Sequence, residues 1–148
     1  MVYGFNRVGK TTLVRVLEHP VLLFDIDCAA RHLKDTAGVN IVPFPWELSA
    51  EGKSKPYAER WRQFGAQLEA AFLADPARYR WLVIDSLTIL QLRLEEEVRR
   101  TNPDNRFDIF TRSAEAILEV YEGSLSRLVN RGLSVLSLCH ADDKKAPK

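Results

Sequence analysis

The sequence predicts an α/β protein with a parallel sheet and helices on both faces, and three observations predict it. Short, continuously apolar runs recur along the 148 residues, which is typical of strands that are buried on both faces. Between them lie longer segments whose apolar residues repeat at the spacing of an amphipathic helix. The two kinds of segment alternate along the chain, and this alternation favours a parallel sheet over an all-helical or all-strand protein.

Five segments carry the strand signal. Residues 21–26, 81–84 and 133–138 are predominantly apolar, as expected of strands in the middle of a parallel sheet. Residues 2–3 can form only the end of a strand. The segment 40–44 is a weaker candidate, because a pair of prolines ends it and proline cannot donate to a sheet ladder.

Four segments carry the helix signal, at residues 10–18, 59–73, 86–100 and 110–128. In each of them apolar residues recur three or four positions apart, so one face is apolar and is expected to pack on the sheet. The first three end just before a His-Pro, Asp-Pro or Asn-Pro pair, and the residue before a proline disfavours the helical conformation. The stripe of the last helix consists of Phe110, Ala114, Ile117, Leu118, Tyr121, Leu125 and Leu128.

The composition excludes several kinds of protein. Lysine and arginine number 21 against 20 aspartate and glutamate, so the net charge of +1 gives no general attraction to nucleic acid or membranes. The two cysteines, Cys28 and Cys139, are too few for a disulfide framework and suit a reducing cytoplasm, where we expect the protein to act. No apolar run reaches the roughly 20 residues that span a bilayer, so no membrane contact is expected.

The first chemical motif is a P-loop at residues 4–11, where two glycines are separated by four residues and followed by Lys10 and Thr11. Glycines let the backbone turn tightly, so that successive N–H groups point at a phosphate, and the following helix adds its positive end. Lys10 is expected to reach the β- and γ-phosphates of ATP and Thr11 to bind Mg²⁺. The predicted nucleotide-binding residues are Gly4, Asn6, Arg7, Val8, Gly9, Lys10, Thr11 and Thr12.

The P-loop lies very near the start of the sequence, and this position affects the expected extent of the domain. Residues 1–148 are long enough for a single domain with its own core, and the charged tail 141–148 is expected to fray. Only three residues precede Gly4, although a P-loop normally follows a full strand, and the polar tail stops before a further strand. We therefore expect a domain that is truncated at both ends.

The second motif is the apolar strand 81–84, which ends in Asp85. A carboxylate at the carboxyl edge of the sheet would hold the hydration shell of Mg²⁺, as in a Walker B motif. The alternative is that Asp85 only caps the helix that follows it. The P-loop upstream favours the metal role.

Hydrolysis also requires a group that orients or deprotonates water, and two further carboxylates are candidates. Many ATPases carry Glu directly after the Walker B aspartate, but Ser86 occupies that position here. Asp25 and Asp27 follow the second strand and therefore lie at the same edge of the sheet, with Asp27 farther out and nearer the phosphates. The alternative is that one or both cap or solvate a loop.

Four segments together resemble a known group of proteins. They are Tyr3-Gly4 with Gly9-Lys10-Thr11-Thr12-Leu13, then Leu22-Leu23-Phe24-Asp25-Ile26-Asp27, then Val83-Ile84-Asp85-Ser86-Leu87-Thr88, and finally Val135 with His140. With these motifs the chain resembles the RecA-like ATPases encoded by phages, the phage nucleotide-binding proteins related to single-strand annealing and recombination ATPases.

The resemblance implies a three-layer P-loop NTPase fold of RecA type, ATP and Mg²⁺ as ligands, and a role in DNA recombination or repair. It also implies that strand 133–138 lies between the P-loop strand and the strand that ends at Asp85. In that family the catalytic carboxylate is a Glu, and the matching residue here is Asp27, one methylene shorter. His140 matches a γ-phosphate sensor position, with a purely structural histidine as the alternative. The predicted catalytic residues are therefore Asp27, Lys10 and His140.

Single-stranded DNA is the predicted partner, because the segment 99–110 mixes arginine with aromatic residues. Cations that follow a phosphate backbone and rings that stack on bases are what single-strand binding requires. Arg99, Arg100, Arg106 and Phe107 are the candidates, and an ordinary connection between helices is the alternative. We also expect a homo-oligomer. The two other functions that the P-loop permits are a small-molecule or nucleotide kinase and a nucleotide switch that does not hydrolyse ATP.

Overall fold

The computed structural model describes residues 1–4, 9–44, 56–101 and 106–140. Its centre is one parallel sheet of five strands in the order β1-β5-β4-β2-β3. The strands are β1 Val2–Gly4, β2 Val21–Asp25, β3 Val39–Pro43, β4 Trp81–Asp85 and β5 Ser134–His140. The predicted fold class is therefore confirmed, and so is the position of the last strand between β1 and β4.

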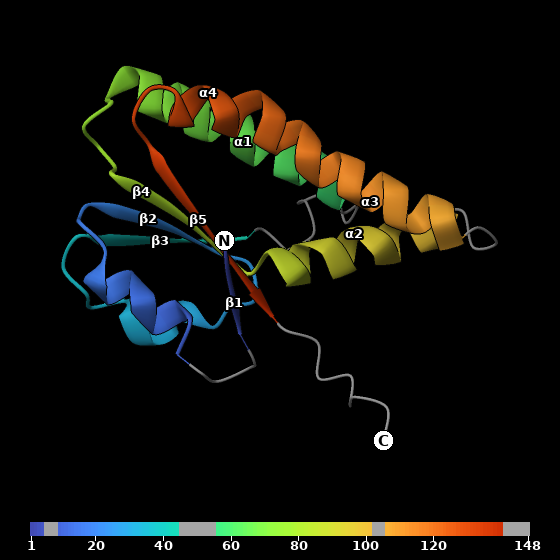
Figure 1. Cartoon of the computed structure of the whole chain (residues 1–148), viewed down its shortest axis with the longest axis horizontal. Helices are drawn as coiled ribbons and strands as arrows, with labels where there is room; N and C mark the ends of the chain where they lie inside the picture. Colours follow the sequence, from blue (N-terminus) through green and yellow to red (C-terminus); the bar gives the residue numbers. More distant parts are fainter. Residues whose placement is uncertain (5–8, 45–55, 102–105, 141–148) are drawn as a thin grey trace, which may run out of the picture.

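Helices cover both faces of this sheet and make three layers (Figure 1). One face carries the long helices, which are α1 Tyr57–Ala74, α2 Leu87–Thr101, α3 Arg106–Val120 and α4 Ser126–Val129. A π-helical turn, η3 Tyr121–Leu125, joins α3 to α4. The other face carries two short 3₁₀ helices, η1 Thr11–Val16 and η2 Ala30–Leu33.

Two of the predicted helices differ from the structure. The segment 10–18 is a 3₁₀ helix rather than an α-helix, because its β-branched residues disfavour the α conformation and only Val14 of the helix is buried. The last helix begins at Arg106, before the predicted residue 110. Its predicted stripe is correct for Ile117, Leu125 and Leu128, which are buried, but wrong for Phe110, which is 58% exposed, and for Leu118.

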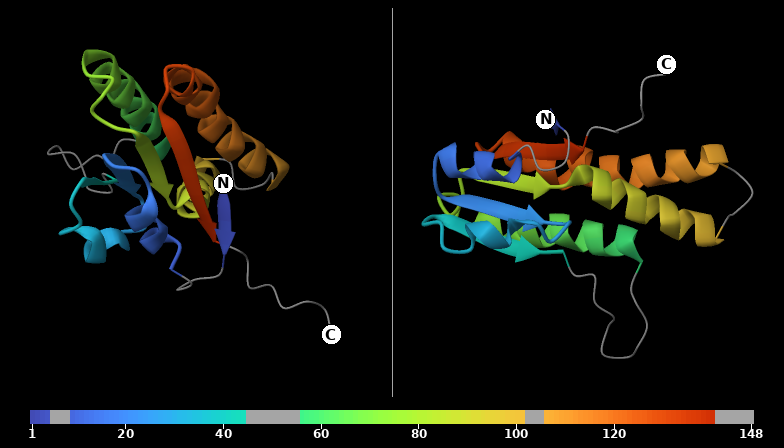
Figure 2. Two further views of the ribbon diagram at one scale, coloured as in Figure 1. Left: turned by 60° about the vertical axis from the view of Figure 1, so that its left-hand side comes forward. Right: turned by 90° about the horizontal axis from the view of Figure 1, so that it is seen from below.

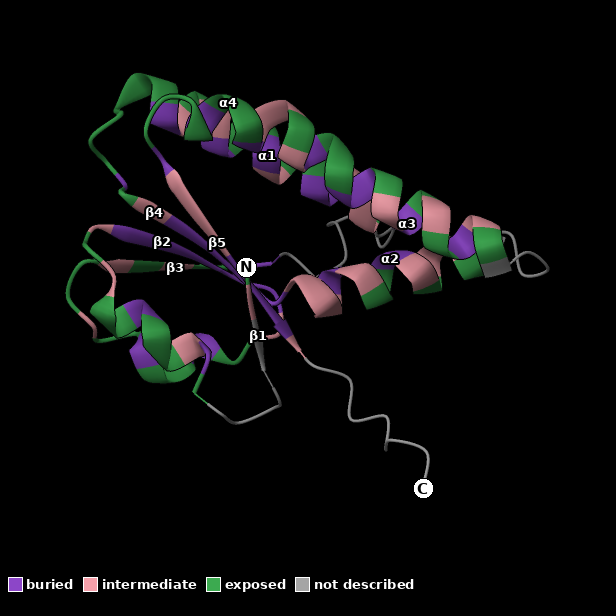
Figure 3. Cartoon of the chain, viewed as in Figure 1, coloured by how far each residue is buried: buried purple, intermediate pink, exposed green. Residues whose placement is uncertain are grey.

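The sheet has an apolar core on each side, as Figure 3 shows by the buried strands at the centre of the molecule. Side chains alternate along a strand, so Leu22 and Phe24 of β2 pack beneath α1 and α3, whereas Val21 and Leu23 pack against η1 and η2. By the same alternation, Asp25 points to the side of the sheet on which Val21 and Leu23 lie. It therefore lies on the η1 side of the sheet, at the carboxyl end of β2.

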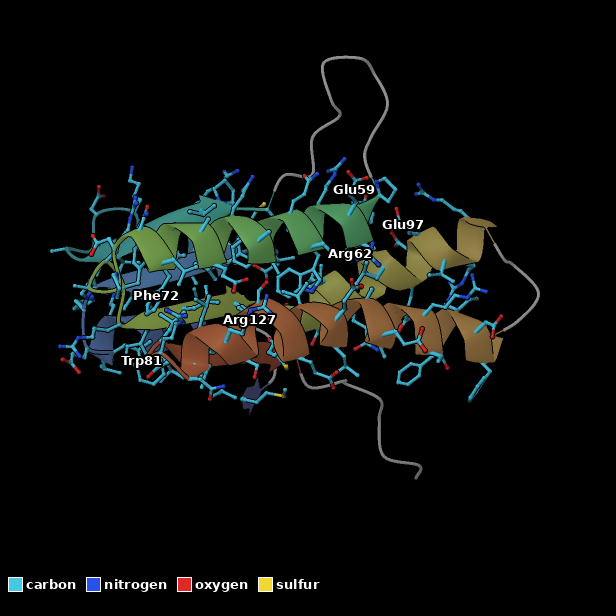
Figure 4. The ribbon with its side chains drawn as sticks, turned by 90° about the horizontal axis from the view of Figure 1, so that it is seen from above. Glu59, Arg62, Phe72, Trp81, Glu97 and Arg127 are labelled. Carbon is cyan, nitrogen blue, oxygen red and sulfur yellow. The ribbon has the colours of Figure 1, made fainter. Side chains whose placement is uncertain are left out.

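The long helices are joined across their surfaces. Arg62 of α1 donates to Glu119 of α3 at 2.7 Å, and Arg127 of α4 donates to both carboxylate oxygens of Glu69 at 2.6 and 2.7 Å (Figure 4). At the start of α1, Glu97 of α2 accepts hydrogen bonds from the first two backbone N–H groups, at 3.0 and 3.3 Å. This carboxylate satisfies donors that a helix start leaves unpaired.

The helices α2 and α3 form an antiparallel hairpin that extends well past the carboxyl edge of the sheet (Figures 1 and 2). Phe110, in the second turn of α3, is exposed, whereas its neighbour Ile109 is buried. None of the helices in the described ranges combines the length and apolarity needed to cross a bilayer.

Candidate functional site

The carboxyl edge of the sheet brings together residues from four strands and the segment after β1. The hydroxyl of Thr11 donates to Asp85 Oδ2 at 2.5 Å, a contact between residues 74 positions apart. Strand register explains the meeting: Asp85 pairs with Asp25 of β2 on one side and with Leu138 of β5 on the other. The sequence-predicted metal residues, Thr11 and Asp85, are therefore neighbours in space.

The P-loop lies directly beside this edge. Gly4 ends β1 and pairs with His140 of β5. Gly9 has a φ of +83°, which only glycine adopts without strain, and its carbonyl accepts the N–H of Thr12 at 3.0 Å to start η1. Lys10 is 7% exposed. The predicted nucleotide-binding residues Asn6, Arg7 and Val8 lie outside the residues that the structure describes.

Asp85 is a buried carboxylate with 1% of its surface exposed. Burial raises its pKa, because the charged form loses water, and the negative charges of Asp27 and Asp25 raise it further. The hydrogen bond from Thr11 and the charge of His140 lower the pKa but do not outweigh burial. A buried acid of this kind is stabilised as the anion by a cation beside it.

The oxygens of Thr11 and Asp85 are of the chemical type that Mg²⁺ prefers. Among the described residues, no group of three or more His, Cys, Asp and Glu side chains converges on a metal position. The site therefore fits a Mg²⁺ that takes its remaining ligands from water and from a nucleotide, as Mg²⁺ usually does. It does not fit a metal held by protein alone.

The structure gives Asp25 and Asp27 different roles. Both oxygens of Asp25 accept backbone hydrogen bonds at the start of η2, from Ala29 at 3.1 Å and Ala30 at 3.2 Å. Asp25 therefore caps a loop, as one alternative expected, and its burial raises its pKa. Asp27 gives one oxygen to the Ala29 N–H at 3.0 Å, but its other oxygen faces His140 Nε2 at 3.2 Å.

Three contacts position His140. Its ring contacts Asp27, its residue pairs with Gly4, and its backbone N–H donates to Thr88 Oγ1 at 2.9 Å. Within the described part of the chain, its ring nitrogen Nδ1 is buried without a hydrogen-bond partner. The part played by Thr88 was not predicted. The available signal was its position in the first turn of the helix after Asp85, from which its side chain reaches the neighbouring strand.

The predicted DNA-binding residues lie at the far end of the α2–α3 hairpin, away from this site (Figure 1). Arg99 and Arg100 are exposed at the end of α2, and Phe107 is 77% exposed at the start of α3. Arg106 begins α3, and residues 102–105 lie outside the described ranges.

Three comparisons with known proteins bear on this site. A family model described as an AAA domain matches residues 1–122. No curated protein matches the chain. Among solved structures, the chain is similar to a KaiC-like protein from the hyperthermophilic archaeon Pyrococcus horikoshii OT3, with 19% identity and a TM-score of 0.55 over 98% of this chain. It spans 63% of the archaeal protein, and at this identity the likeness concerns the P-loop fold alone.

Proposed function

The chain belongs to the AAA_24 family of AAA domains and is a P-loop ATPase domain, and we propose on this premise that it binds ATP with Mg²⁺ and hydrolyses the ATP. We further propose that it acts on single-stranded DNA in recombination or repair, as a homo-oligomer. The observation that carries the first proposal is the contact between Thr11 and Asp85 beside Lys10.

This contact supports a metal-dependent nucleotide site for an energetic reason. Keeping the carboxylate of Asp85 out of water is unfavourable, and a single hydroxyl donor compensates it only in part. Lys10, at the start of η1, supplies a positive charge for the phosphates. Mg²⁺, when bound, would neutralise charge on the phosphates. The cost of burying Asp85 is then recovered in the complex with the metal.

Asp27 and His140 supply what hydrolysis needs in addition. A carboxylate oxygen accepts a proton from water while the water oxygen attacks the γ-phosphorus, and the bond to the bridging oxygen of ADP breaks. The His140 contact orients Asp27 Oδ2, and the Ala29 N–H holds the other oxygen. In the described part of the chain, Nδ1 of His140 is buried without a hydrogen-bond partner, which is costly, and a phosphate oxygen or water would satisfy it.

A phosphate-release assay with and without single-stranded DNA tests this function. Release that requires Mg²⁺ and rises with DNA supports the proposal. Formation of ADP that requires an added acceptor molecule, without release of free phosphate, identifies a kinase instead. Tight ATP binding without any phosphate release identifies a nucleotide switch, for which the short side chain of Asp27 is the physical reason.

The DNA proposal rests on the exposed Arg99, Arg100 and Phe107 and on the resemblance to recombination ATPases. If the arginines neutralise phosphates, the logarithm of affinity falls by about 0.7 for each tenfold rise in salt and each phosphate contacted. Replacing Arg99, Arg100 and Arg106 together with Ala should flatten this slope. Phe107→Ala should lower affinity by about 1–3 kcal/mol through lost stacking and leave the slope unchanged.

Fluorescence anisotropy over a salt series makes this measurement. The matched control replaces Arg78, Arg80 and Arg131 with Ala, because this removes the same charge away from the hairpin. A hairpin variant whose slope equals that of the wild type, or a control that flattens the slope equally, would show that the hairpin does not bind DNA. Sedimentation with and without ATP measures the oligomeric state.

A further inference from the structure

Strand β5 extends two residues beyond its neighbour β4. The last pair between them is Asp85 with Leu138, after which β4 turns into α2. Cys139 and His140 continue β5 and pair only with β1. On the β4 side, these residues therefore have no strand to hold them in place.

On the β4 side, the side chain of Thr88 provides the hydrogen bond that a neighbouring strand would otherwise provide. It lies in the first turn of α2, and its hydroxyl oxygen accepts the backbone N–H of His140 at 2.9 Å. Burial raises the pKa of the neighbouring Cys139 thiol, and the same hydroxyl lowers that pKa in part. The side chain of Thr88 thus holds the end of β5 at His140, and it does so from a helix rather than from the sheet.

The position of His140 determines the contact that the proposed hydrolysis uses. Its ring lies 3.2 Å from Asp27, and Gly4 at the start of the P-loop pairs with it. A shift of Thr88 would therefore move His140 relative to Asp27. Among the described residues, the Thr88 hydroxyl bonds to the end of β5 rather than to Thr11 or Asp85, so we expect that nucleotide binding does not depend on it directly.

The other end of α2 lies in the projecting hairpin. The helix has 15 residues, so it is about 22 Å long, and the buried Leu90 and Leu94 attach it to the core. A helix moves largely as one body, and a displacement at Arg99 and Arg100 is carried to its first turn. A displacement of about 1 Å at a reacting group can change a rate by roughly 100-fold.

We propose that Thr88 is a positioning residue that sets His140 against Asp27 and so makes ATP turnover respond to the position of the α2–α3 hairpin. This inference rests on the proposed function, because the hairpin carries the proposed DNA contacts. It assigns the coupling between DNA and hydrolysis to one hydroxyl group and one backbone N–H.

The first test compares Thr88→Val, which removes the hydroxyl at nearly constant size, with Thr88→Ser, which keeps it. The matched control is Thr111→Val on α3, where the side chain is likewise half-buried but distant from the nucleotide site. Thr88→Val should lower kcat by roughly 10- to 100-fold, leave KM and the affinity for an ATP analogue unchanged, and abolish stimulation by single-stranded DNA. Thr88→Ser and Thr111→Val should behave like the wild type.

The second test asks whether Thr88 acts through His140. Thr88→Val should have no further effect on kcat in a His140→Ala background. Full activity of Thr88→Val, a loss of ATP affinity equal to its loss of rate, or additive effects in the double variant would each overturn the inference while leaving the proposed function intact. A wild-type protein that releases no phosphate would overturn both, and one that hydrolyses ATP without responding to DNA would overturn the inference and the DNA proposal.

Discussion

Replacing Asp27 with Asn is expected to remove hydrolysis while preserving both the fold and the affinity for ATP. The Asn side chain has the same size and shape. Its amide oxygen can still accept the Ala29 N–H, now 3.0 Å from Asp27 Oδ1. Its NH₂ group faces His140 Nε2, which accepts a hydrogen bond when that nitrogen carries no proton. An amide, however, cannot take a proton from water.

The magnitudes separate the two effects. Loss of a general base lowers a rate by roughly 10²- to 10⁴-fold, which corresponds to about 2.7–5.4 kcal/mol at 1.36 kcal/mol for each factor of ten. The change in stability should stay near the roughly 1 kcal/mol of one ordinary hydrogen bond. Asp27 Oδ2 contacts His140 Nε2, and in the described ranges no backbone group donates to that oxygen.

Single-turnover phosphate release measures the rate, a fluorescent ATP analogue measures affinity, and thermal unfolding checks the fold. Asp25→Asn is the matched control, because it makes the same chemical change in a carboxylate whose oxygens both bind backbone N–H groups. It should change stability more than turnover. An active Asp27→Asn beside an inactive Asp25→Asn would refute the reasoning and reverse the two roles.

Four further predictions follow from the same structure. Lys10→Ala should weaken ATP binding by the roughly 1.5–3 kcal/mol of a hydrogen bond to a charged group, as measured with a labelled analogue; unchanged affinity in a folded variant refutes the P-loop assignment. Asp85→Asn should raise the Mg²⁺ concentration that half-saturates turnover, and a titration curve identical to that of the wild type would make Asp85 only a helix cap. Burial raises the pKa of Asp25, so the stability that its protonated form contributes is present below the unfolded pKa of about 3.9 and is lost as the pH rises through the folded pKa. Urea unfolding should show the wild type losing stability relative to Asp25→Asn between these two pKa values. A difference in unfolding free energy that does not change with pH would contradict this. Gly65→Ala would place Cβ 2.7 Å from a methyl group of α3 and should cost about 1–3 kcal/mol in urea unfolding, whereas Gly123→Ala, with open space around it, should not.

The parts of this protein that follow from local sequence were predictable. An apolar run reports a buried strand wherever the strand lies in the sheet, so the β2, β4 and β5 segments were identified within two residues at each end. The meeting of Thr11 with Asp85 was also predictable. Each motif ends at the carboxyl edge of a parallel sheet, and the edge itself brings them together.

The remainder depended on contacts that leave no periodic signal. The different roles of Asp25 and Asp27 are set by η2, a four-residue 3₁₀ helix too short to be seen as a hydrophobic pattern. Glu97 caps the start of α1, and only the packing of two helices reveals that role. Phe110 fits an apolar stripe by its spacing, yet it is exposed and its neighbour Ile109 is buried, and only the packing of α3 decides between them.

The edge position of β1 has a consequence for how the protein is made. Among the described strands β1 pairs only with β5, and Val2 with Leu138 and Gly4 with His140 are residues almost the whole chain apart. Pairings between such distant residues form slowly, because a long loop must close, at a cost in entropy, before the pairing contributes favourable energy. During synthesis β1 is made before β5, so this pairing cannot form until β5 has followed. The proposed nucleotide site, which lies at the end of β1, is therefore expected to gain this strand pairing late in folding.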